Sequence, residues 1–140
     1  MKNIAQGEIE LKTEGANIRH VLIIEDEPNI IEALSFIFFR DGWKVDAHSD
    51  GANAVTTTIQ TGPNAIILDV MLPNKSGFEI LEELREVPEY REIPILMLTA
   101  RGQTKDRELA LAKGATQFII KPFSNSEVLR TMNELIGREQ

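Results

Sequence analysis

The stretch Val21-Leu-Ile-Ile-Glu25-Asp26-Glu-Pro28 decides the fold, because a continuous apolar run ends abruptly in acidic residues. Further short apolar runs follow at 65–68, 95–98 and 118–120. Continuous hydrophobicity over so few residues is typical of strands that are covered on both faces, as in a parallel sheet. The segment Trp43-Lys-Val-Asp-Ala-His48 instead alternates apolar and polar residues, which predicts an edge strand.

Amphipathic segments with helix start and stop signals separate these runs. The first begins near Pro28, carries an apolar stripe and ends before Gly42. A second helix is predicted to begin at Ala52 and to end at Gly62-Pro63. Further helices are predicted from Ser76 to Val87, from Thr104 to Lys113 and from Ser124 to Ile136, and those at Ser76 and Ser124 open with the spacing of a capping box. Because crossovers between parallel strands are right-handed, five such units predict a doubly wound (βα)5 fold of the α/β class, with helices on both faces.

Length and composition narrow the range of functions. The 140 residues suit one domain, and a content of 42% hydrophobic and 26% charged residues is that of an ordinary globular protein. The absence of Cys excludes disulfides and thiolate chemistry, and we expect a cytoplasmic location. A formal net charge of -7 argues against direct binding to nucleic acid or to an anionic membrane, and no apolar run is long enough to span a membrane.

Three parts of the chain are distinguished on this basis. Residues 19–137 hold the predicted domain, and residues 138–140 form a C-terminal tail. Residues 1–18 precede the first strand, and Glu8-Ile-Glu-Leu-Lys-Thr13 alternates like an exposed strand. Two interpretations of this extension remain open, a disordered tail and an added edge strand or docking segment.

Reactive side chains follow four of the predicted strands. Glu25-Asp26-Glu27 comes after the first strand, Asp69 after the third, Thr99 after the fourth and Lys121 after the fifth. In an open parallel sheet the carboxyl ends of the strands meet in one crevice, where ligands bind. We therefore expect these side chains to lie together although they are far apart in the sequence.

Crowded carboxylates favour a bound cation. Glu25, Asp26 and Asp69 would repel one another unless a cation neutralises them, and hard oxygen ligands without His or Cys suit Mg²⁺. A carboxylate beside such a metal can act as a nucleophile towards a phosphoryl donor, while Lys121 and Thr99 stabilise the added charge. Taken singly, each of these residues is more often a solvated or capping group, and we interpret Glu27, His20 and His48 in that structural way.

These motifs resemble the receiver domain of bacterial two-component response regulators. The resemblance rests on four matches in chain order over residues 19–137: Val-Leu-Ile-Ile-Glu25-Asp26-Glu-Pro, Ile-Ile-Leu-Asp69-Val-Met-Leu-Pro73 with Gly77, Leu-Thr99-Ala100, and Lys121-Pro122-Phe123. It implies a flavodoxin-like sheet of strand order 2-1-3-4-5. It also implies a phosphoprotein that takes its phosphoryl group from a histidine kinase or a histidine phosphotransfer protein and signals to a downstream protein.

The resemblance assigns a role to each matched position. Asp69 is the implied phosphoacceptor, and Mg²⁺ is held by Glu25, Asp26, Asp69 and the backbone carbonyl of Met71. Thr99 and Lys121 contact the phosphoryl group. Phe118 stands where the family has its switch aromatic, so phosphorylation is expected to draw Thr99 inward, seat Phe118 in the vacated space and change the surface of helix 4, strand 5 and helix 5. The bond between Lys121 and Pro122 is a cis peptide in many relatives.

Some features depart from the family pattern or leave alternatives open. Phe118 lacks the hydroxyl of Tyr, and Met71 and Arg101 occupy positions that tune the lifetime of the acyl phosphate. The chain ends soon after the last helix, so we expect a stand-alone receiver or a piece of a longer protein. Phe39 either packs or contributes to a partner surface, including that of a phosphorylation-linked homodimer. The rival functions are a degenerate receiver acting as a constitutive interaction module, a haloacid-dehalogenase-type phosphatase and a flavin mononucleotide carrier.

Overall fold

The strands form one parallel sheet at the centre of the molecule. The computed structural model describes residues 18–100 and 104–138. Within them lie β2 (His20–Ile24), β3 (Lys44–His48), β4 (Ala65–Asp69), β5 (Ile95–Thr99) and β6 (Gln117–Ile120). The strand order is β3-β2-β4-β5-β6, and every neighbouring pair is parallel. In chain order this is 2-1-3-4-5, which confirms the predicted doubly wound fold.

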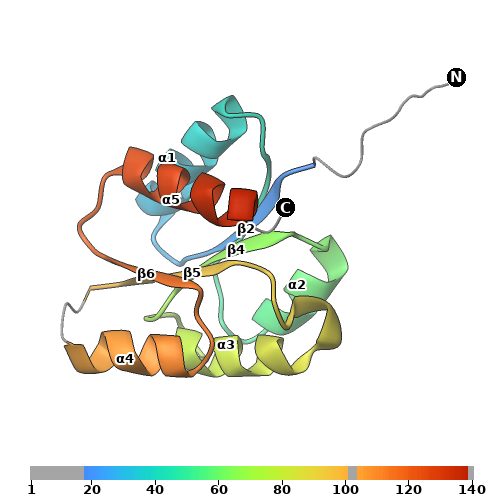
Figure 1. Ribbon diagram of the computed structural model, residues 1–140, viewed down its shortest axis with the longest axis vertical. Coiled ribbons are helices and arrows are strands. Elements are labelled where there is room, and N and C mark those ends of the chain that lie inside the picture. The colour runs from blue at the N-terminus through green and yellow to red at the C-terminus, as the bar shows by residue number, and fades with distance from the viewer. Residues whose placement is uncertain (1–17, 101–103, 139–140) are drawn as a thin grey trace, which may run out of the picture.

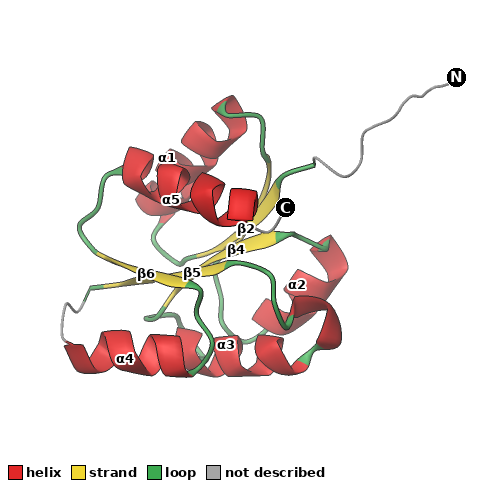
Figure 2. Ribbon diagram, in the orientation of Figure 1, coloured by secondary structure: helices red, strands yellow, loops and turns green. Residues whose placement is uncertain are grey.

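Helices cover both faces of the sheet. They are α1 (Pro28–Arg40), α2 (Ala54–Thr61), α3 (Gly77–Glu86), α4 (Thr104–Ala112) and α5 (Asn125–Arg138), with a short 3-10 helix η2 (Pro88–Tyr90). Figure 1 shows α1 and α5 on one face and α2, α3 and α4 on the other. Figure 2 shows that the loops joining strands to helices lie at the two ends of the strands. No helix in the described ranges is both long and apolar enough to cross a membrane.

The two faces of the sheet build two separate cores. Alternate residues of a strand point to opposite faces, so Leu22 and Ile24 pack towards α2, α3 and α4, whereas Val21 and Ile23 pack towards α1 and α5. All the residues of β2, β4 and β5 are buried, while β3 at the edge is half exposed. The predictions of buried central strands and of an edge strand at β3 are therefore confirmed, but β6 forms the other edge of the sheet and its last residue, Ile120, is 43% exposed, so the prediction that this strand is covered on both faces was wrong there.

Several predicted boundaries differ from the observed ones by one or two residues, as at β3 and α2. Trp43 lies before β3, where its ring meets Phe38 edge-on at a centroid distance of 5.2 Å. Helix α2 begins at Ala54 and not at Ala52, because the Ala52 N–H donates to the Asp50 carboxylate at 2.7 Å in a turn that precedes the helix. The capping box at Ser76 is present: the Ser76 hydroxyl accepts from the Glu79 N–H, and the Glu79 carboxylate accepts from the Ser76 N–H.

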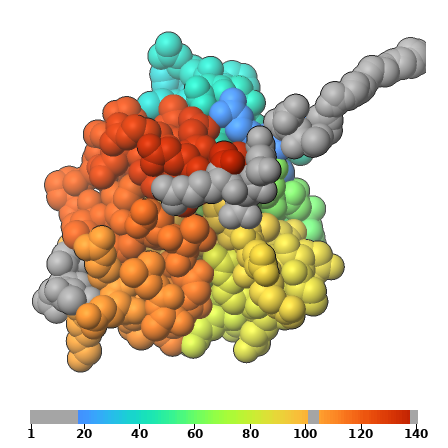
Figure 3. Space-filling model, in the orientation of Figure 1, coloured from blue at the N-terminus to red at the C-terminus, as the bar shows by residue number. Residues whose placement is uncertain are grey.

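Arg85 joins the end of α3 to the segments that follow it. Its guanidinium donates to the carbonyls of Tyr90, Ile93 and Gly114, each at 2.8 Å. Figure 3 shows these regions side by side on one face of the molecule, in yellow around residue 90 and in orange around residue 114. One planar guanidinium thereby satisfies two carbonyls of the connection between α3 and β5 and one carbonyl of the connection between α4 and β6.

Helix α1 exposes two of its aromatic side chains. Leu34 and Phe38 are buried, but Phe36 is 62% exposed and Phe39 is 73% exposed. Of the two alternatives left open for Phe39, the structure contradicts simple packing, because the buried stripe of α1 is only one face wide. The alternatives for residues 1–18, and the role of Arg101, lie outside the described residues except for Ile18.

Candidate functional site

The pairing of the strands brings the candidate residues together at the carboxyl ends of the strands, which form one edge of the sheet. Ile24 is paired with Leu68, so Glu25 follows β2 at the level where β4 ends in Asp69. Thr99 at the end of β5 is paired with Ile120, and Lys121 follows β6 directly. The predicted gathering of these residues at the carboxyl ends of the strands is what the structure shows.

Three carboxylates converge at this edge. One oxygen from each of Glu25, Asp26 and Asp69 lies within 4.8 Å of the other two. Glu25 is fully buried and Asp69 is 1% exposed, whereas Asp26 is open to solvent. The group is therefore reachable from outside on one side only.

Lys121 is the cation that faces this group. Its ammonium donates to Asp69 Oδ2 at 3.2 Å, and it lies 3.3 Å from Glu25 Oε1. Glu27 Oε2 is more distant at 3.9 Å, and the Glu27 side chain is exposed and caps no helix. The solvated-loop interpretation of Glu27 therefore describes its surroundings well.

The electrostatics of the site show that its negative charge is only partly balanced. Burial raises the pKa of Glu25 to about 7, and the negative charge of Asp69 adds to this shift. Burial alone would lower the pKa of Lys121, but the charges of Asp69 and Glu25 outweigh this effect and raise it. Lys121 thus remains an ammonium, while Glu25 titrates close to neutral pH.

The donor set fits a hard divalent cation. Glu25 Oε1 is a buried carboxylate oxygen with no hydrogen-bond partner among the described residues, and it belongs to the converging group. The cation near this oxygen is the Lys121 ammonium at 3.3 Å, which also pairs with Asp69, so a bound divalent cation would supply positive charge that one shared ammonium does not. The three carboxylates supply oxygen atoms alone, as Mg²⁺ prefers.

The loop after β4 is folded tightly around Asp69. The Met71 N–H donates to Asp69 Oδ1 at 3.3 Å, and the Gly77 N–H donates to the Val70 carbonyl at 2.9 Å. A Cβ atom at Gly77 would lie 2.2 Å from the Asp69 carbonyl oxygen, so only glycine lets α3 begin so close to the site. The Met71 side chain is 59% exposed.

Thr99 and Phe118 lie on the same face of adjacent strands. Thr99 is paired with Ile120, and Phe118 lies two residues earlier on β6, where it is paired with Met97. Both are buried, Thr99 at 2% and Phe118 at 7% exposure, and Phe118 belongs to the core on the side of α2, α3 and α4. The peptide bond between Lys121 and Pro122 is cis.

The structure adds residues near the site that the strand-end argument missed. Asp50, in the loop between β3 and α2, accepts from the Asn74 amide, in the loop between β4 and α3. Only the turn-forming pair Asp50-Gly51 and the turn-prone Asn74 mark these positions in the sequence. The two histidines have structural surroundings: His20 Nε2 lies 2.7 Å from Asp46 Oδ2, and the His48 carbonyl accepts from the Glu25 N–H.

Comparison with known proteins identifies the family. The family model described as the response regulator receiver domain matches residues 21–133. The chain belongs to the response regulator receiver family. This places it in two-component signalling, in agreement with the acidic group at the carboxyl ends of the strands.

Curated relatives of this receiver are transcriptional regulators. The probable transcriptional regulatory protein TcrX of Mycobacterium tuberculosis is 36% identical over 118 residues, which cover 84% of this chain and 50% of that protein. The phosphate regulon transcriptional regulatory protein PhoB of Escherichia coli is 36% identical over 120 residues, covering 86% of this chain and 52% of PhoB. The chain thus spans about half the length of the curated relatives it matches.

Solved receiver structures share the fold over nearly their whole length. The chemotaxis response regulator CheY4 of Vibrio cholerae matches with a TM-score of 0.80 at 29% identity, covering 85% of this chain and 99% of CheY4. The receiver domain of the sensor histidine kinase PA1611 of Pseudomonas aeruginosa matches with a TM-score of 0.78 at 30% identity, covering 86% of this chain and 98% of that one. That structure is described as having a magnesium ion coordinated in the active-site cleft.

Proposed function

We propose that this receiver accepts a phosphoryl group on Asp69 from a histidine kinase or a histidine phosphotransfer protein, with Mg²⁺ as cofactor. The observation that carries the proposal is the meeting of Asp69, Glu25, Asp26 and Lys121 at one edge of the sheet. The proposed receiver domain comprises residues 19–137, and we place it in the cytoplasm, where it modifies itself and turns over no metabolite.

The proposed step is an attack by Asp69 on phosphorus. A carboxylate oxygen of Asp69 forms the new O–P bond while the N–P bond of the phosphohistidine breaks, and the electron pair of that bond returns to the imidazole nitrogen. Lys121 lies 3.2 Å from Asp69 Oδ2, so its ammonium is placed beside the oxygens that the transfer brings in. The Thr99 hydroxyl, at the end of the adjacent strand, is the second proposed contact of the phosphoryl group.

Glu25, Asp26, Asp69 and the Met71 carbonyl are the proposed holders of Mg²⁺. When bound, the cation supplies positive charge that neutralises the carboxylates and the oxygens of the phosphoryl group. The partly open position of Asp26 leaves this side of the group accessible to solvent and to a phosphodonor.

The output is proposed to pass through Thr99 and Phe118. Both side chains are buried on the same face of β5 and β6. A movement of the Thr99 hydroxyl towards the phosphoryl group would therefore change the space available to Phe118. Phosphorylation then favours the inward arrangement of Phe118 over outward ones and changes the surface formed by α4, β6 and α5. That surface then binds a downstream protein, or a second copy of the chain in a phosphorylation-linked homodimer.

Direct binding to nucleic acid is not part of the proposal. The net charge of -7 repels a phosphate backbone. The RpaA regulator of Synechocystis, described as DNA-binding, is 36% identical over 118 residues, but these cover only 49% of RpaA. Its description therefore applies to a protein about twice the length of the matched region.

Phosphoryl incorporation from acetyl phosphate tests this function. Wild type is expected to gain one phosphoryl group in Mg²⁺ and none in excess chelator, and Asp69→Ala is expected to gain none. Equal incorporation into Asp69→Ala would contradict the proposal, and no incorporation into wild type would favour the degenerate receiver. Multiple-turnover hydrolysis of phosphomonoesters would favour the phosphatase, and a yellow colour of the purified protein would favour the flavin carrier.

A further inference from the structure

The loop 70–76 after the proposed phosphoacceptor is fixed at its base. Hydrogen bonds hold Met71 to the Asp69 side chain and Gly77 to the Val70 carbonyl, so the end of the loop at the start of α3 lies next to its beginning at the end of β4. The Met71 carbonyl lies near the start of this loop, and its position also depends on what holds the middle of the loop at Pro73 and Asn74.

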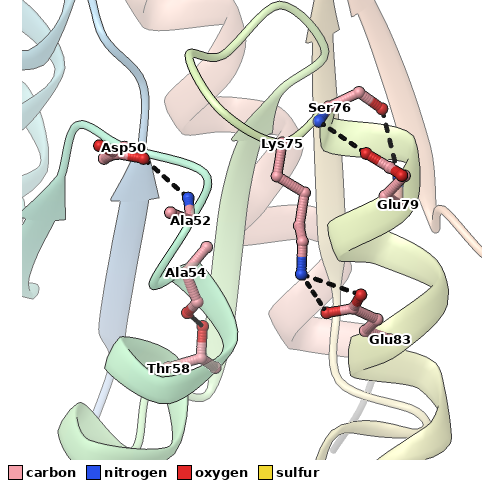
Figure 4. Close-up of polar contacts among 8 residues, drawn as sticks. All are labelled: Asp50, Ala52, Ala54, Thr58, Lys75, Ser76, Glu79 and Glu83. Carbon is pink, nitrogen blue, oxygen red and sulfur yellow. Dashed lines mark hydrogen bonds and ion pairs between the residues drawn. The ribbon is translucent and has the colours of Figure 1, made fainter.

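The middle of this loop is held by the loop between β3 and α2. The Gly51 N–H donates to the Pro73 carbonyl at 3.0 Å. The Asn74 amide donates to both carboxylate oxygens of Asp50, at 3.0 and 2.9 Å. A Cβ atom at Gly51 would lie 2.2 Å from the Lys75 carbonyl oxygen, so the two backbones are in direct contact. Figure 4 shows Asp50 and Ala52 in the loop before α2, and Lys75 and Ser76 before α3.

The backbone at Asn74 needs this support. Asn74 has a φ of +73°, and the Lys75 N–H donates to the Pro73 carbonyl at 2.9 Å across it, which makes a γ-turn. A turn of this kind with a positive φ is rare and strained for a residue with a side chain. Hydrogen bonds from Ala52 and Asn74 also lower the pKa of Asp50, so the side chain that holds Asn74 is a carboxylate. Hydrogen bonds to a charged acceptor are stronger than those between neutral groups.

We propose that Asp50 is a positioning residue for the cation site, acting through Asn74 on the loop that carries the Met71 carbonyl. This inference rests on the proposed function, because it takes that carbonyl as a ligand of Mg²⁺. Asp50 is not itself among the converging carboxylates of Glu25, Asp26 and Asp69. Groups that orient ligands without touching the metal commonly change metal affinity about 10-fold or more when removed.

Asn74→Gly is the deciding variant. It keeps the net charge and accepts the positive φ, but it removes the amide that reaches Asp50. Calorimetric titration with Mg²⁺ is expected to show a Kd about 10-fold higher than that of wild type. The rate of phosphorylation by acetyl phosphate should recover at saturating Mg²⁺, a split that a general loss of folding would not produce.

Variants of Asp50 separate positioning from charge. Asp50→Ala should weaken Mg²⁺ binding, and adding Asn74→Gly to it should weaken binding little further, because both remove the same link. Asp50→Asn should retain part of the affinity, since its amide oxygen can still accept from Asn74. Asp41→Asn is the matched control: Asp41 Oδ2 accepts from Arg19 and Asn133, so the substitution removes one charge from a similar link elsewhere and should leave the Kd unchanged.

Two results would overturn the inference, and they are distinguishable. If Asn74→Gly binds Mg²⁺ like wild type while Asp50→Ala and Asp50→Asn weaken binding equally, only the charge of Asp50 matters and the positioning role is wrong. If wild type itself binds no Mg²⁺, the proposed function fails, and the inference fails with it.

Discussion

The ammonium of Lys121 lies 3.2 Å from Oδ2 of Asp69, although 52 residues separate the two in the chain. The same ammonium lies 3.3 Å from Glu25 Oε1, so one positive charge faces carboxylates from two strands. Any cation that binds to Glu25 and Asp69 must share them with Lys121. This arrangement leads to opposite effects on binding and on phosphoryl transfer.

Replacing Lys121 is expected to strengthen Mg²⁺ binding while slowing phosphorylation. Lys121→Met removes the competing ammonium, so the Kd for Mg²⁺ should fall in a calorimetric titration. The rate of phosphorylation by acetyl phosphate should drop by about 100-fold, because a fixed charge beside the phosphoryl oxygens is lost. Lys113→Met, which removes a lysine paired with Glu82 at 2.7 Å, is the control and should change neither quantity. Parallel changes in both quantities would argue against the proposed role of Lys121.

Mg²⁺ binding is expected to weaken below neutral pH. Burial and the charge of Asp69 raise the pKa of Glu25 to about 7, so Mg²⁺ must displace a proton from Glu25 at lower pH. For one displaced proton, affinity falls by about 10-fold for each pH unit below that pKa. Titrations between pH 5.5 and 8 check this expectation, and a flat profile would contradict it.

The same shift predicts the pH dependence of stability. A raised pKa means that the folded protein binds the Glu25 proton more tightly than the unfolded chain does. The resulting stabilisation is complete below the ordinary pKa of 4.5 and is lost as the pH rises through about 7. In urea unfolding without Mg²⁺, Glu25→Gln should flatten this decline, whereas Glu32→Gln, at an exposed position of α1, should leave it unchanged.

Two phenylalanines of α1 are expected to differ sharply in their effect on stability. Phe38 is fully buried and meets the Trp43 ring at an interplanar angle of 71°, so Phe38→Ala should cost about 3–5 kcal/mol of unfolding free energy. Phe39 is 73% exposed, and Phe39→Ala should stay within about 0.5 kcal/mol of wild type. Urea denaturation measures both, and equal losses would contradict the packing described for α1.

Two glycines provide a second matched pair. A Cβ atom at Gly77 would lie 2.2 Å from the Asp69 carbonyl oxygen, so Gly77→Ala should cost about 1–3 kcal/mol and weaken Mg²⁺ binding as α3 shifts. Gly137, in the last turns of α5, has open space at the same position, and Gly137→Ala should be neutral or stabilising. Thermal unfolding with and without Mg²⁺ compares them. A Gly77→Ala protein as stable as wild type would show that the close approach is not required.

The fold and the core of the site were accessible from the sequence because both follow from short-range patterns. Four apolar runs end in Glu25, Asp69, Thr99 and Lys121, and parallel pairing alone brings such ends together. Burial on both faces of the central strands follows from the same runs. The roles of these residues, in contrast, come from family resemblance and remain proposals.

Contacts between loops could not be predicted in the same way. Nothing in the spacing of Asp50 and Asn74 shows that the two loops touch, since their contact depends on how α2 and α3 pack beside each other. The three carbonyls that Arg85 binds, and the raised pKa of Glu25, likewise depend on burial that only the folded chain creates. The exposure of Phe39 was left open because a wholly apolar helix end does not reveal which face is buried.

Locating the phosphoryl group within the chain tests the central claim most directly. Wild-type protein treated with acetyl phosphate and Mg²⁺ can be fragmented and examined by mass spectrometry, with Asp69→Asn treated in parallel. The account predicts one phosphoryl group on the peptide that contains Asp69, and none on the Asp69→Asn protein. A phosphoryl group on another residue, or equal labelling of the two proteins, would contradict it.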